Sequence, residues 1–197
     1  MSTLRAKNAV AAAVMGALLS VASPAIASAQ SPSGSWAPNP LPLASLKGHD
    51  QAAAVTTVGL RNGKSGKFLQ PTGNSTANGA RVVQQPGNDQ NSSQYWNMIP
   101  DGNFFSFENG RSGKNLGIDG ASTAAGAAAI IANGSGDLNQ DWLIIPVDGG
   151  VPDDAVLQNR KSGLCLGISG ASTANGAQAA QFACDGSANQ IWVLDLL

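Results

Sequence analysis

Short apolar runs separated by turn residues follow one another from residue 55 to 197, and no segment keeps a sustained apolar period of about 3.6 residues. In three places a β-favouring run, at 58–60, 104–107 and 155–157, stops just before an Asn-x-x-Ser-Gly sequence. That sequence is typical of a turn, because Asn and Gly tolerate positive φ angles. With nine further short runs, the pattern predicts an all-β, barrel-like domain. The further predicted strands are 67–69, 80–84, 96–99, 115–118, 127–131, 142–145, 164–168, 178–182 and 192–194.

Three sequence markers recur in step along this region and define an internal repeat. Each copy carries the Asn-x-x-Ser-Gly turn, a loop close to Gly-Ala-Ser-Thr-Ala-Asn-Gly-Ala, and a final Gln-x-Trp. The first two markers shift by 47 and 50 residues between copies, and the tryptophans shift by 46 and 50. The copies run over about 55–101, 102–150 and 151–197. The markers are Asn62, Asn109 and Asn159, then 73–80, 120–127 and 170–177, then Trp96, Trp142 and Trp192.

The three tryptophans are the candidate structural core. One copy of about 47 residues cannot bury its own apolar face, so the three copies are expected to share a centre. Trp96, Trp142 and Trp192 recur once per copy and are expected to fill it. The glutamine two positions before each tryptophan is expected to satisfy buried backbone groups.

The first 29 residues have the layout of a secretory signal peptide. Arg5 and Lys7 precede the uncharged run 9–19, and Ala27-Ser28-Ala29 offers a small-x-small cleavage site. The alternative is a membrane anchor, but the apolar run is shorter than the roughly 20 residues that span a bilayer. We therefore expect a secreted chain that keeps no membrane segment after cleavage. Residues 30–54 are rich in Pro, Ser and Gly and predict a disordered linker, which contains His49.

Charge and composition exclude several classes of function. Charged residues make up 12% of the chain and the formal net charge is −1, which becomes −3 if cleavage follows residue 29. A nucleic-acid partner is not expected, because phosphate neutralisation needs a surplus of Lys and Arg. The single histidine excludes metal sites built on paired imidazoles. We expect no metal and no cofactor.

No arrangement of catalytic residues is evident. A single linker histidine cannot assemble a nucleophile–histidine pair with the domain. Asp153 and Asp154 are adjacent, and neighbours on a strand point to opposite faces. Asp137 and Asp141 are expected to lie in a solvated turn. We predict a non-catalytic protein; the alternative, a glycosidase with two carboxylates, depends on the distance between them.

The three Gln-x-Trp copies, with Ser-Thr-Ala-Asn-Gly loops, resemble the ricin B-type lectin domain over about residues 55–197. The third copy is the most similar, with Ser-Gly-Leu-Cys-Leu-Gly at 162–167 and Asn-Gln-Ile-Trp at 189–192. The resemblance implies a β-trefoil, in which three four-stranded units surround a pseudo-threefold axis. It also implies that Cys165 and Cys184, the chain's two cysteines, form a disulfide within the third copy.

The resemblance further implies a sugar pocket in each copy. In that family an Asp after the Cys-Leu pair holds sugar hydroxyls, an aromatic two residues before the second Cys stacks on the ring, and an Asn and the Gln of Gln-x-Trp complete the hydrogen bonds. In the third copy Phe182, Asn189 and Gln190 match this pattern, but Gly167 replaces the Asp. Two roles remain open for Phe182: stacking on a sugar, or packing beside the disulfide.

The other two copies depart further from the family pattern. In the second copy Asn139 and Gln140 match the amides, whereas Gly117 replaces the Asp and Ala132 replaces the aromatic. The first copy has Gln70, Gln85, Ser93 and Gln94 at the four positions. Asp119 and Asp185 lie nearby in sequence, and the hypothesis is that they supply a carboxylate from a shifted position.

The missing carboxylate predicts weak binding. A charge-assisted hydrogen bond contributes about 1.5–3 kcal/mol, while a millimolar sugar site has only about 4 kcal/mol in total. We therefore predict a lectin-like protein that binds a polysaccharide or glycan weakly. The alternative is a protein-interaction or protease-inhibitor module, with a protein partner, on a β-trefoil whose sugar sites have degenerated.

Overall fold

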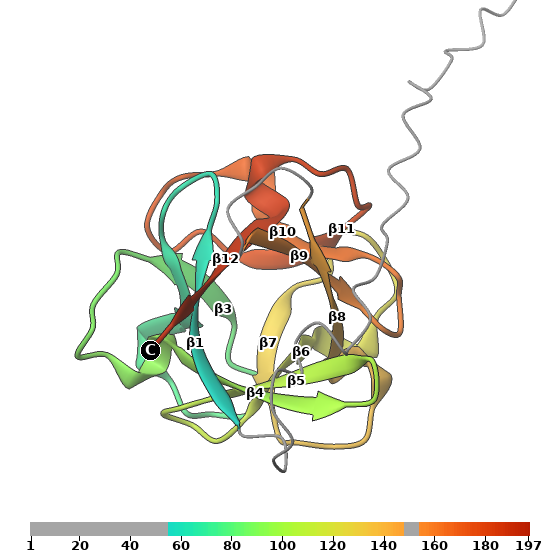
Figure 1. The fold of residues 1–197 in the computed structure, drawn as a ribbon, viewed down its shortest axis with the longest axis horizontal. Coiled ribbons are helices and arrows are strands. Elements are labelled where there is room, and N and C mark those ends of the chain that lie inside the picture. Colours follow the sequence, from blue (N-terminus) through green and yellow to red (C-terminus); the bar gives the residue numbers. More distant parts are fainter. Residues whose placement is uncertain (1–54, 148–153) are drawn as a thin grey trace, which may run out of the picture. The chain divides into compact units, whose positions relative to one another are not determined.

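Six strands pair edge to edge into a closed antiparallel barrel, which Figure 1 shows from one end. The computed structural model describes residues 55–147 and 154–197, so the predicted signal peptide, the linker with His49, and Asp153 lie outside the described residues. Each copy contributes its first and last strand to the barrel. The barrel strands are β1 (Thr56–Asn62), β4 (Tyr95–Asp101), β5 (Phe104–Asn109), β8 (Asp141–Pro146), β9 (Asp154–Asn159) and β12 (Ile191–Leu196).

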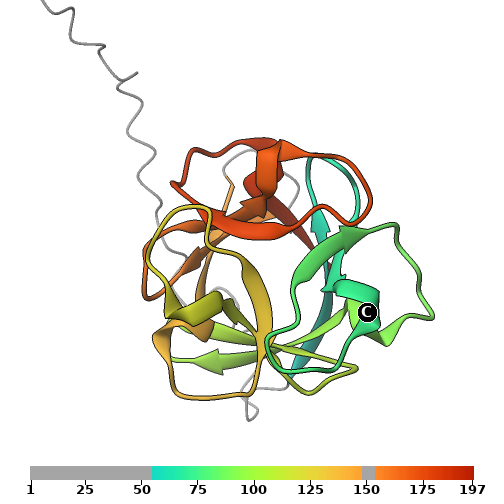
Figure 2. The same ribbon diagram turned by 180° about the vertical axis from the view of Figure 1, so that it is seen from behind.

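The two inner strands of each copy form a hairpin, and the three hairpins contact one another through single bridges. Figure 2 shows three lobes, one from each copy, arranged around a common centre. The all-β prediction and the β-trefoil implied by the resemblance are confirmed. The hairpin strands are β2 (Phe68–Pro71), β3 (Val82–Gln85), β6 (Asn115–Ile118), β7 (Ala129–Ala132), β10 (Cys165–Ile168) and β11 (Ala179–Phe182).

All twelve predicted strands are present, with ends that differ by a few residues. The described residues also contain six three-residue 3₁₀ turns, which were not predicted because so short a turn has no apolar periodicity to reveal it. They are η2 (Thr72–Asn74), η3 (Ser92–Gln94), η4 (Asp119–Ala121), η5 (Leu138–Gln140), η6 (Ser169–Ala171) and η7 (Ala188–Gln190).

The three tryptophans lie at the centre of the core, as predicted. Trp96, Trp142 and Trp192 have no exposed surface and belong to one apolar cluster. Each indole N–H donates to the carbonyl of the leucine in the second strand of its own copy, over 3.0–3.2 Å. Each ring therefore fills the core and also ties its hairpin to the barrel. Truncation of such a ring to alanine costs roughly 3–5 kcal/mol.

The turn asparagines join successive copies. Each side-chain oxygen accepts hydrogen bonds from two backbone N–H groups of its own turn. Each side-chain amide donates to a backbone carbonyl of the preceding copy, with the third copy preceding the first around the barrel. These bonds run from Asn62 to Asn189, from Asn109 to Ser93 and from Asn159 to Asn139, over 2.8–2.9 Å.

Two buried glutamines clamp the Ser-Thr-Ala loops of neighbouring copies. The amide of Gln84 donates to the carbonyls of Ser172 and Ala174, both at 2.9 Å, and its oxygen accepts from the Ser65 hydroxyl at 2.7 Å. Gln181 repeats this arrangement with Ser122, Ala124 and Ser162. At the equivalent position of the second copy stands Ile131. The recurrent loop sequence therefore has a structural role at two of the three junctions.

The predicted disulfide is present between Cys165 and Cys184, whose Cα atoms lie 5.1 Å apart. The bridge links β10 to the segment after β11, and it packs with Ile145 and Val156 in a small second apolar cluster. With a sequence separation of 19 between the two cysteines, the chain-entropy model gives about 3 kcal/mol of stabilisation.

We predict that Gln84→Ile, which introduces the residue of the second copy, lowers the free energy of unfolding by about 1–3 kcal/mol, because two carbonyls and a hydroxyl lose their partner. Urea denaturation followed by tryptophan fluorescence measures the loss. Ser65→Ala removes one of the three clamp bonds, together with the bond that the Lys67 N–H donates to the same hydroxyl, and serves as the control, with a smaller loss expected. An unchanged urea midpoint for Gln84→Ile would show that the clamp contributes no stability.

Candidate functional site

The glutamine of each Gln-x-Trp is buried and holds the loop between the third strand and the 3₁₀ turn. The amide of Gln190 donates to the carbonyl of Ala183 at 2.9 Å, and its oxygen accepts from the N–H of Asp185 at 3.2 Å. Gln94 and Gln140 make the equivalent pair of backbone bonds. The prediction that these side chains satisfy backbone groups is confirmed. Gln140 and Gln190 therefore shape the candidate pockets through the loop.

In the third copy the structure places Phe182 at the end of β11, opposite Cys165, with its ring partly exposed. Asn189 lies in η7. Its amide donates to the carbonyl of Ile168 at 3.4 Å, and its oxygen accepts from the Ser187 hydroxyl at 2.8 Å. The hairpin thus offers an apolar ring, and the turn offers a partly exposed amide.

The glycines at the acid position are part of the packing. A Cβ atom added to Gly167 would lie 2.9 Å from Cγ of Gln190 and 3.3 Å from Nδ2 of Asn189. A Cβ added to Gly117 would lie 3.0 Å from Cγ of Gln140. In the second and third copies the 3₁₀ turn therefore packs directly on bare backbone, and the place of the family's carboxylate is closed.

The second copy holds an unpaired acceptor. Asn139 is 6% exposed, and its amide donates to the carbonyl of Ile118 at 3.1 Å. Its buried side-chain oxygen has no hydrogen-bond partner among the described residues. In the third copy the corresponding oxygen, on Asn189, accepts from the Ser187 hydroxyl. At the position of Ser187 the second copy has Asp137, whose carboxylate has no proton to donate and accepts from Ser135 instead.

Only the first copy has a polar side chain at the acid position. Gln70 is 6% exposed, and its oxygen accepts from the amides of Gln94 at 2.9 Å and Asn91 at 3.2 Å. Its own amide donates to Asn74 at 2.8 Å. Sequence reasoning did not single out Asn74 or Asn91, since neither matches a family position. The first copy therefore presents a cluster of four amides, with Asn74 and Asn91 at its partly exposed edge.

The two acids that stood near the pockets in sequence are both exposed. Asp119 pairs with Arg81 at 3.5 Å, across the junction of the first and second copies. Asp185 follows the disulfide and accepts from the N–H of Ser187 at 2.9 Å. Asp185 also donates its backbone N–H to Gln190, so it lies beside the third-copy pocket.

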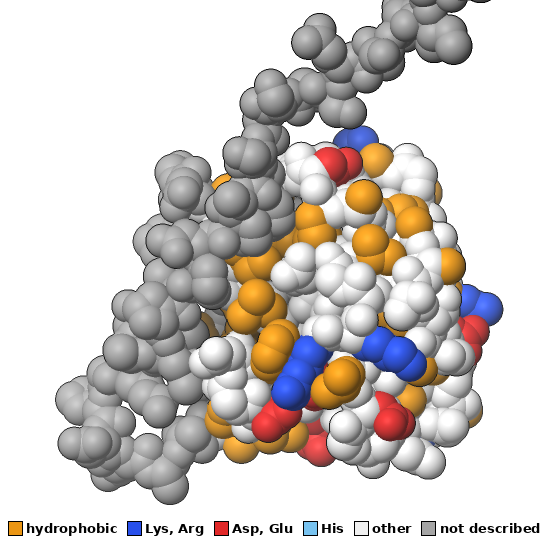
Figure 3. Space-filling model, turned by 90° about the vertical axis from the view of Figure 1, so that its right-hand side faces the viewer, with side chains coloured by type: hydrophobic (Ala, Val, Ile, Leu, Met, Phe, Trp, Pro, Cys, Tyr) orange, Lys and Arg blue, Asp and Glu red, His pale blue; other side chains and the backbone are white. Residues whose placement is uncertain are grey.

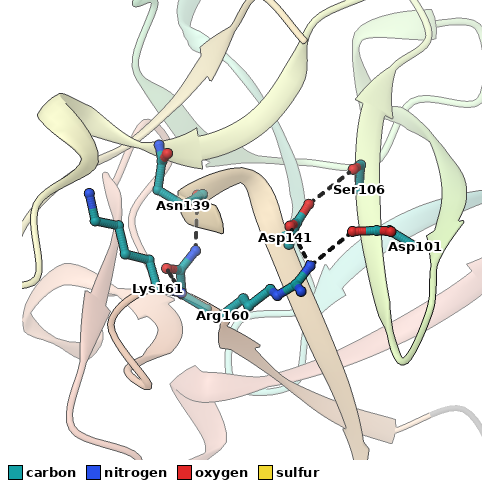
Figure 4. A network of polar contacts seen from close by, with 7 residues as sticks. Asp101, Ser106, Asn139, Asp141, Arg160 and Lys161 are labelled. Atoms are coloured by element: carbon teal, nitrogen blue, oxygen red, sulfur yellow. Dashed lines mark hydrogen bonds and ion pairs between the residues drawn. The ribbon is translucent and has the colours of Figure 1, made fainter. Parts of the chain in front are cut away.

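The expectation of a solvated turn at Asp137 and Asp141 is wrong for Asp141, which is 5% exposed. Figure 4 shows it beside Arg160, whose Nη1 bonds both Asp141, at 3.1 Å, and Asp101, at 2.9 Å. The guanidinium also lies 4.5 Å from the centre of the Phe104 ring. It occupies the space between two carboxylates that a glycosidase leaves to the scissile bond. This cluster therefore has the form of a structural link, in which Arg160 of the third copy joins Asp101 of the first copy to Asp141 of the second.

The rest of the described surface is sparsely charged. On the face drawn in Figure 3, acidic and basic side chains are few and stand among neutral polar surface. Arg61 bridges β1 and β12 by a bidentate bond to Asp195, which raises the pKa of the guanidinium above its usual value. Within residues 55–147 and 154–197 no three His, Cys, Asp or Glu side chains are grouped to hold a metal ion. No helix of these residues has the length and apolar character needed to cross a bilayer.

Comparison with known proteins identifies the family. The model of the ricin-type beta-trefoil lectin domain-like family matches residues 49–133 and 135–196, most of the chain. The chain therefore belongs to this family, whose domains are typically non-catalytic although some are attached to enzymes. A search of curated proteins gave no match.

Solved structures show the same fold. The designed threefold-symmetric protein ThreeFoil is 32% identical, with a TM-score of 0.68, and the match covers 72% of this chain and 99% of that one. An exo-beta-1,3-galactanase from Clostridium thermocellum is 26% identical, with a TM-score of 0.69; the match covers 75% of this chain and 31% of that one. The ricin B-like lectin of Macrolepiota procera, solved with lactose, is 20% identical over 74% of this chain and 98% of its own, with a TM-score of 0.62. At that identity the lectin shows likeness of fold alone.

We predict that Gly167→Ala lowers the free energy of unfolding by about 1–3 kcal/mol, because the new methyl group meets the Gln190 side chain. Gly136→Ala is the matched control, since nothing lies within 4 Å of a Cβ at that exposed loop position. We expect the control to be unchanged or slightly more stable. Equal urea midpoints for the two variants would contradict a closed acid position.

Proposed function

We propose that the chain is a secreted, non-catalytic, lectin-like protein that recognises a polysaccharide or glycan weakly. The observation that carries the proposal is the partial retention of the family pocket. The 3₁₀ turn with its glutamine stands in all three copies, and amide side chains remain around it. Amides and aromatic rings suit the two sides of a sugar, since hydroxyls need hydrogen-bond partners and the C–H face is apolar.

Weak recognition follows from the chemistry that is present. The third-copy pocket offers the Phe182 ring and the Asn189 amide, with no carboxylate at Gly167. The cluster of four amides in the first copy replaces the charge with neutral hydrogen bonds. Such bonds contribute about 0.5–1.5 kcal/mol each, against about 1.5–3 for a charged one. A single pocket is therefore expected to bind in the millimolar range.

A repeating polysaccharide suits this arrangement better than a single sugar. The three copies are fixed on one barrel, so a long ligand that reaches two pockets gains affinity without any new contact. This gain compensates for the absent carboxylate only if the ligand carries several equivalent sugar units.

Secretion is supported by the signal-like sequence at 1–29 and by the Cys165–Cys184 disulfide. Disulfides persist in oxidising compartments and are rare in the cytosol. After cleavage of such a signal the chain would meet glycans outside the cell.

A protein partner is the alternative function. The closed acid positions at Gly117 and Gly167 favour it, because they remove the family's strongest sugar contact. The exposed Ser-Thr-Ala loops would then supply the contact surface.

The chain without residues 1–29 is tested on a glycan array, and the glycans it retains are titrated by calorimetry. We predict saturable, millimolar-range binding that Phe182→Ala weakens by about fivefold or more, because a stacking face is lost. Val55→Ala is the control, since Val55 is an exposed apolar residue just before β1, at none of the family positions, and its loss is expected to change nothing.

Retention of full affinity by Phe182→Ala would remove the third-copy pocket from the proposal. A chain that binds no glycan, but retains a protein that free sugar does not displace, would favour the alternative function.

A further inference from the structure

The first copy places an aromatic ring where the third copy has its disulfide. Phe68 stands at the position of Cys165, because both lie six residues after the turn asparagine. Phe68 pairs with Gln85 across its hairpin as Cys165 pairs with Phe182, so Gly87 stands at the position of Cys184. Phe68 belongs to neither of the two apolar clusters of the described core, and its ring is partly exposed.

Two glycines make room for this ring. A Cβ on Gly59 would lie 2.7 Å from Cε1 of Phe68, and a Cβ on Gly87 would lie 2.8 Å from Cε2. Any other residue at either position would displace the ring. The backbone is therefore shaped to hold an aromatic side chain outside the core.

The neighbouring loop is one residue longer in the first copy. Asn62 lies 34 residues before Trp96, whereas this separation is 33 in both other copies. The longer loop carries Asn88 and Asp89, and it is held by the hydroxyl of Tyr95, which donates to the carbonyl of Asp89. The N–H of Asn88 donates to the side chain of Gln94 at 2.9 Å.

Ring and loop together line an open hollow of about 540 Å³, within the volume range of small-ligand sites. Its floor and walls include both aromatic rings, Phe68 and Tyr95. At its rim, the exposed Asp89 carboxylate makes no ion pair or hydrogen bond with the described residues, and Asn88 keeps its side-chain N–H groups free. Leu197 completes the wall and lies beside β1 (Figure 1). The other lining residues are Gly59, Gly87 and Gln94.

We propose that this hollow is a second kind of carbohydrate site, in which a pyranose ring stacks on Phe68 and Tyr95. Its hydroxyls donate to the Asp89 carboxylate and accept from the Asn88 amide. Apart from Gln94, the lining residues lie outside the positions that the family uses, and the site restores to the first copy the aromatic face and carboxylate that its family pocket lacks. The proposal rests on the proposed carbohydrate-binding function and names a place for it.

The equivalent places of the other copies are filled differently. In the third copy the disulfide packs against Val156, the counterpart of Gly59. In the second copy the side chain of Asn115 lies over Gly134 and donates to Gln140 at 3.1 Å. The counterpart of Tyr95 there is Asp141, which is engaged by Arg160. The aromatic pair is therefore specific to the first copy.

The chain's single tyrosine makes a site-specific test possible. The chain from residue 30 is produced with 3-fluorotyrosine, and its one ¹⁹F signal is followed while the glycans found by array and calorimetry are added. We expect the Tyr95 signal to shift and saturate as glycan is added. The Kd from this titration should equal the Kd that calorimetry gives for this site. Phe68→Leu removes the ring, keeps an apolar side chain, and should weaken the binding seen at Tyr95 by about fivefold or more. Asp89→Asn should also weaken it, because the charge is lost.

Phe182→Leu is the matched control for a glycan too short to reach two pockets, since it removes the ring of the third-copy pocket and should leave the Tyr95 titration by such a glycan unchanged. Variants are compared only when their urea midpoints match the parent chain. If calorimetry detects binding while the Tyr95 signal stays still, or while Phe68→Leu and Asp89→Asn leave its titration unchanged, the hollow is not a sugar site and the proposed function stands. If neither calorimetry nor the array detects any glycan, the proposed function fails and this proposal fails with it.

Discussion

The hydrogen bond from each buried indole to a leucine carbonyl fixes the relation between hairpin and barrel, and the candidate sites depend on it. In the third copy the bond joins Trp192 to Leu166 at 3.0 Å. Gly167 follows that leucine directly, and Gln190 precedes that tryptophan by two residues, so the bond brings these two positions together. The second copy repeats the arrangement with the same spacing. The contact between the 3₁₀ turn and the acid position is therefore set by the core.

Because the core sets the same backbone arrangement in all three pockets, the chemical differences between the pockets come from their side chains. Where the acid position is glycine, the glutamine side chain packs against bare backbone and its polar atoms bond the loop, with one further bond from Asn115 in the second copy. Where the position is Gln70, the same glutamine shares its amide between a side chain and the loop carbonyl of Pro86. One side-chain difference in the second strand thus decides whether the turn closes the pocket or joins a polar cluster.

The all-β repeat was predictable because three markers keep step along the chain, and the family resemblance that those markers carry implied the β-trefoil. The contacts of the site residues were less predictable. The burial of Asp141 depends on Arg160, which the third copy supplies, and the resemblance carries no information about that pair. The open acceptor of Asn139 depends on a neighbouring Asp where the third copy has Ser187. The hollow of the first copy left two signals, the extra loop residue and the Phe–Gly replacement of the cystine, but the size of a cavity depends on packing between distant segments.

The first copy differs from the others in how its polar groups are connected. Gln94 bonds Gln70 of the amide cluster, and its oxygen accepts from the N–H of Asn88 at the rim of the hollow. A single buried side chain therefore links the family pocket to the neighbouring hollow. In the second and third copies glycine at the acid position leaves the glutamine without a corresponding side-chain partner there. The hydrogen bonds of Gln94 therefore run from Gln70 to the loop at Asn88, and in these polar contacts the first copy departs from the threefold symmetry of the fold.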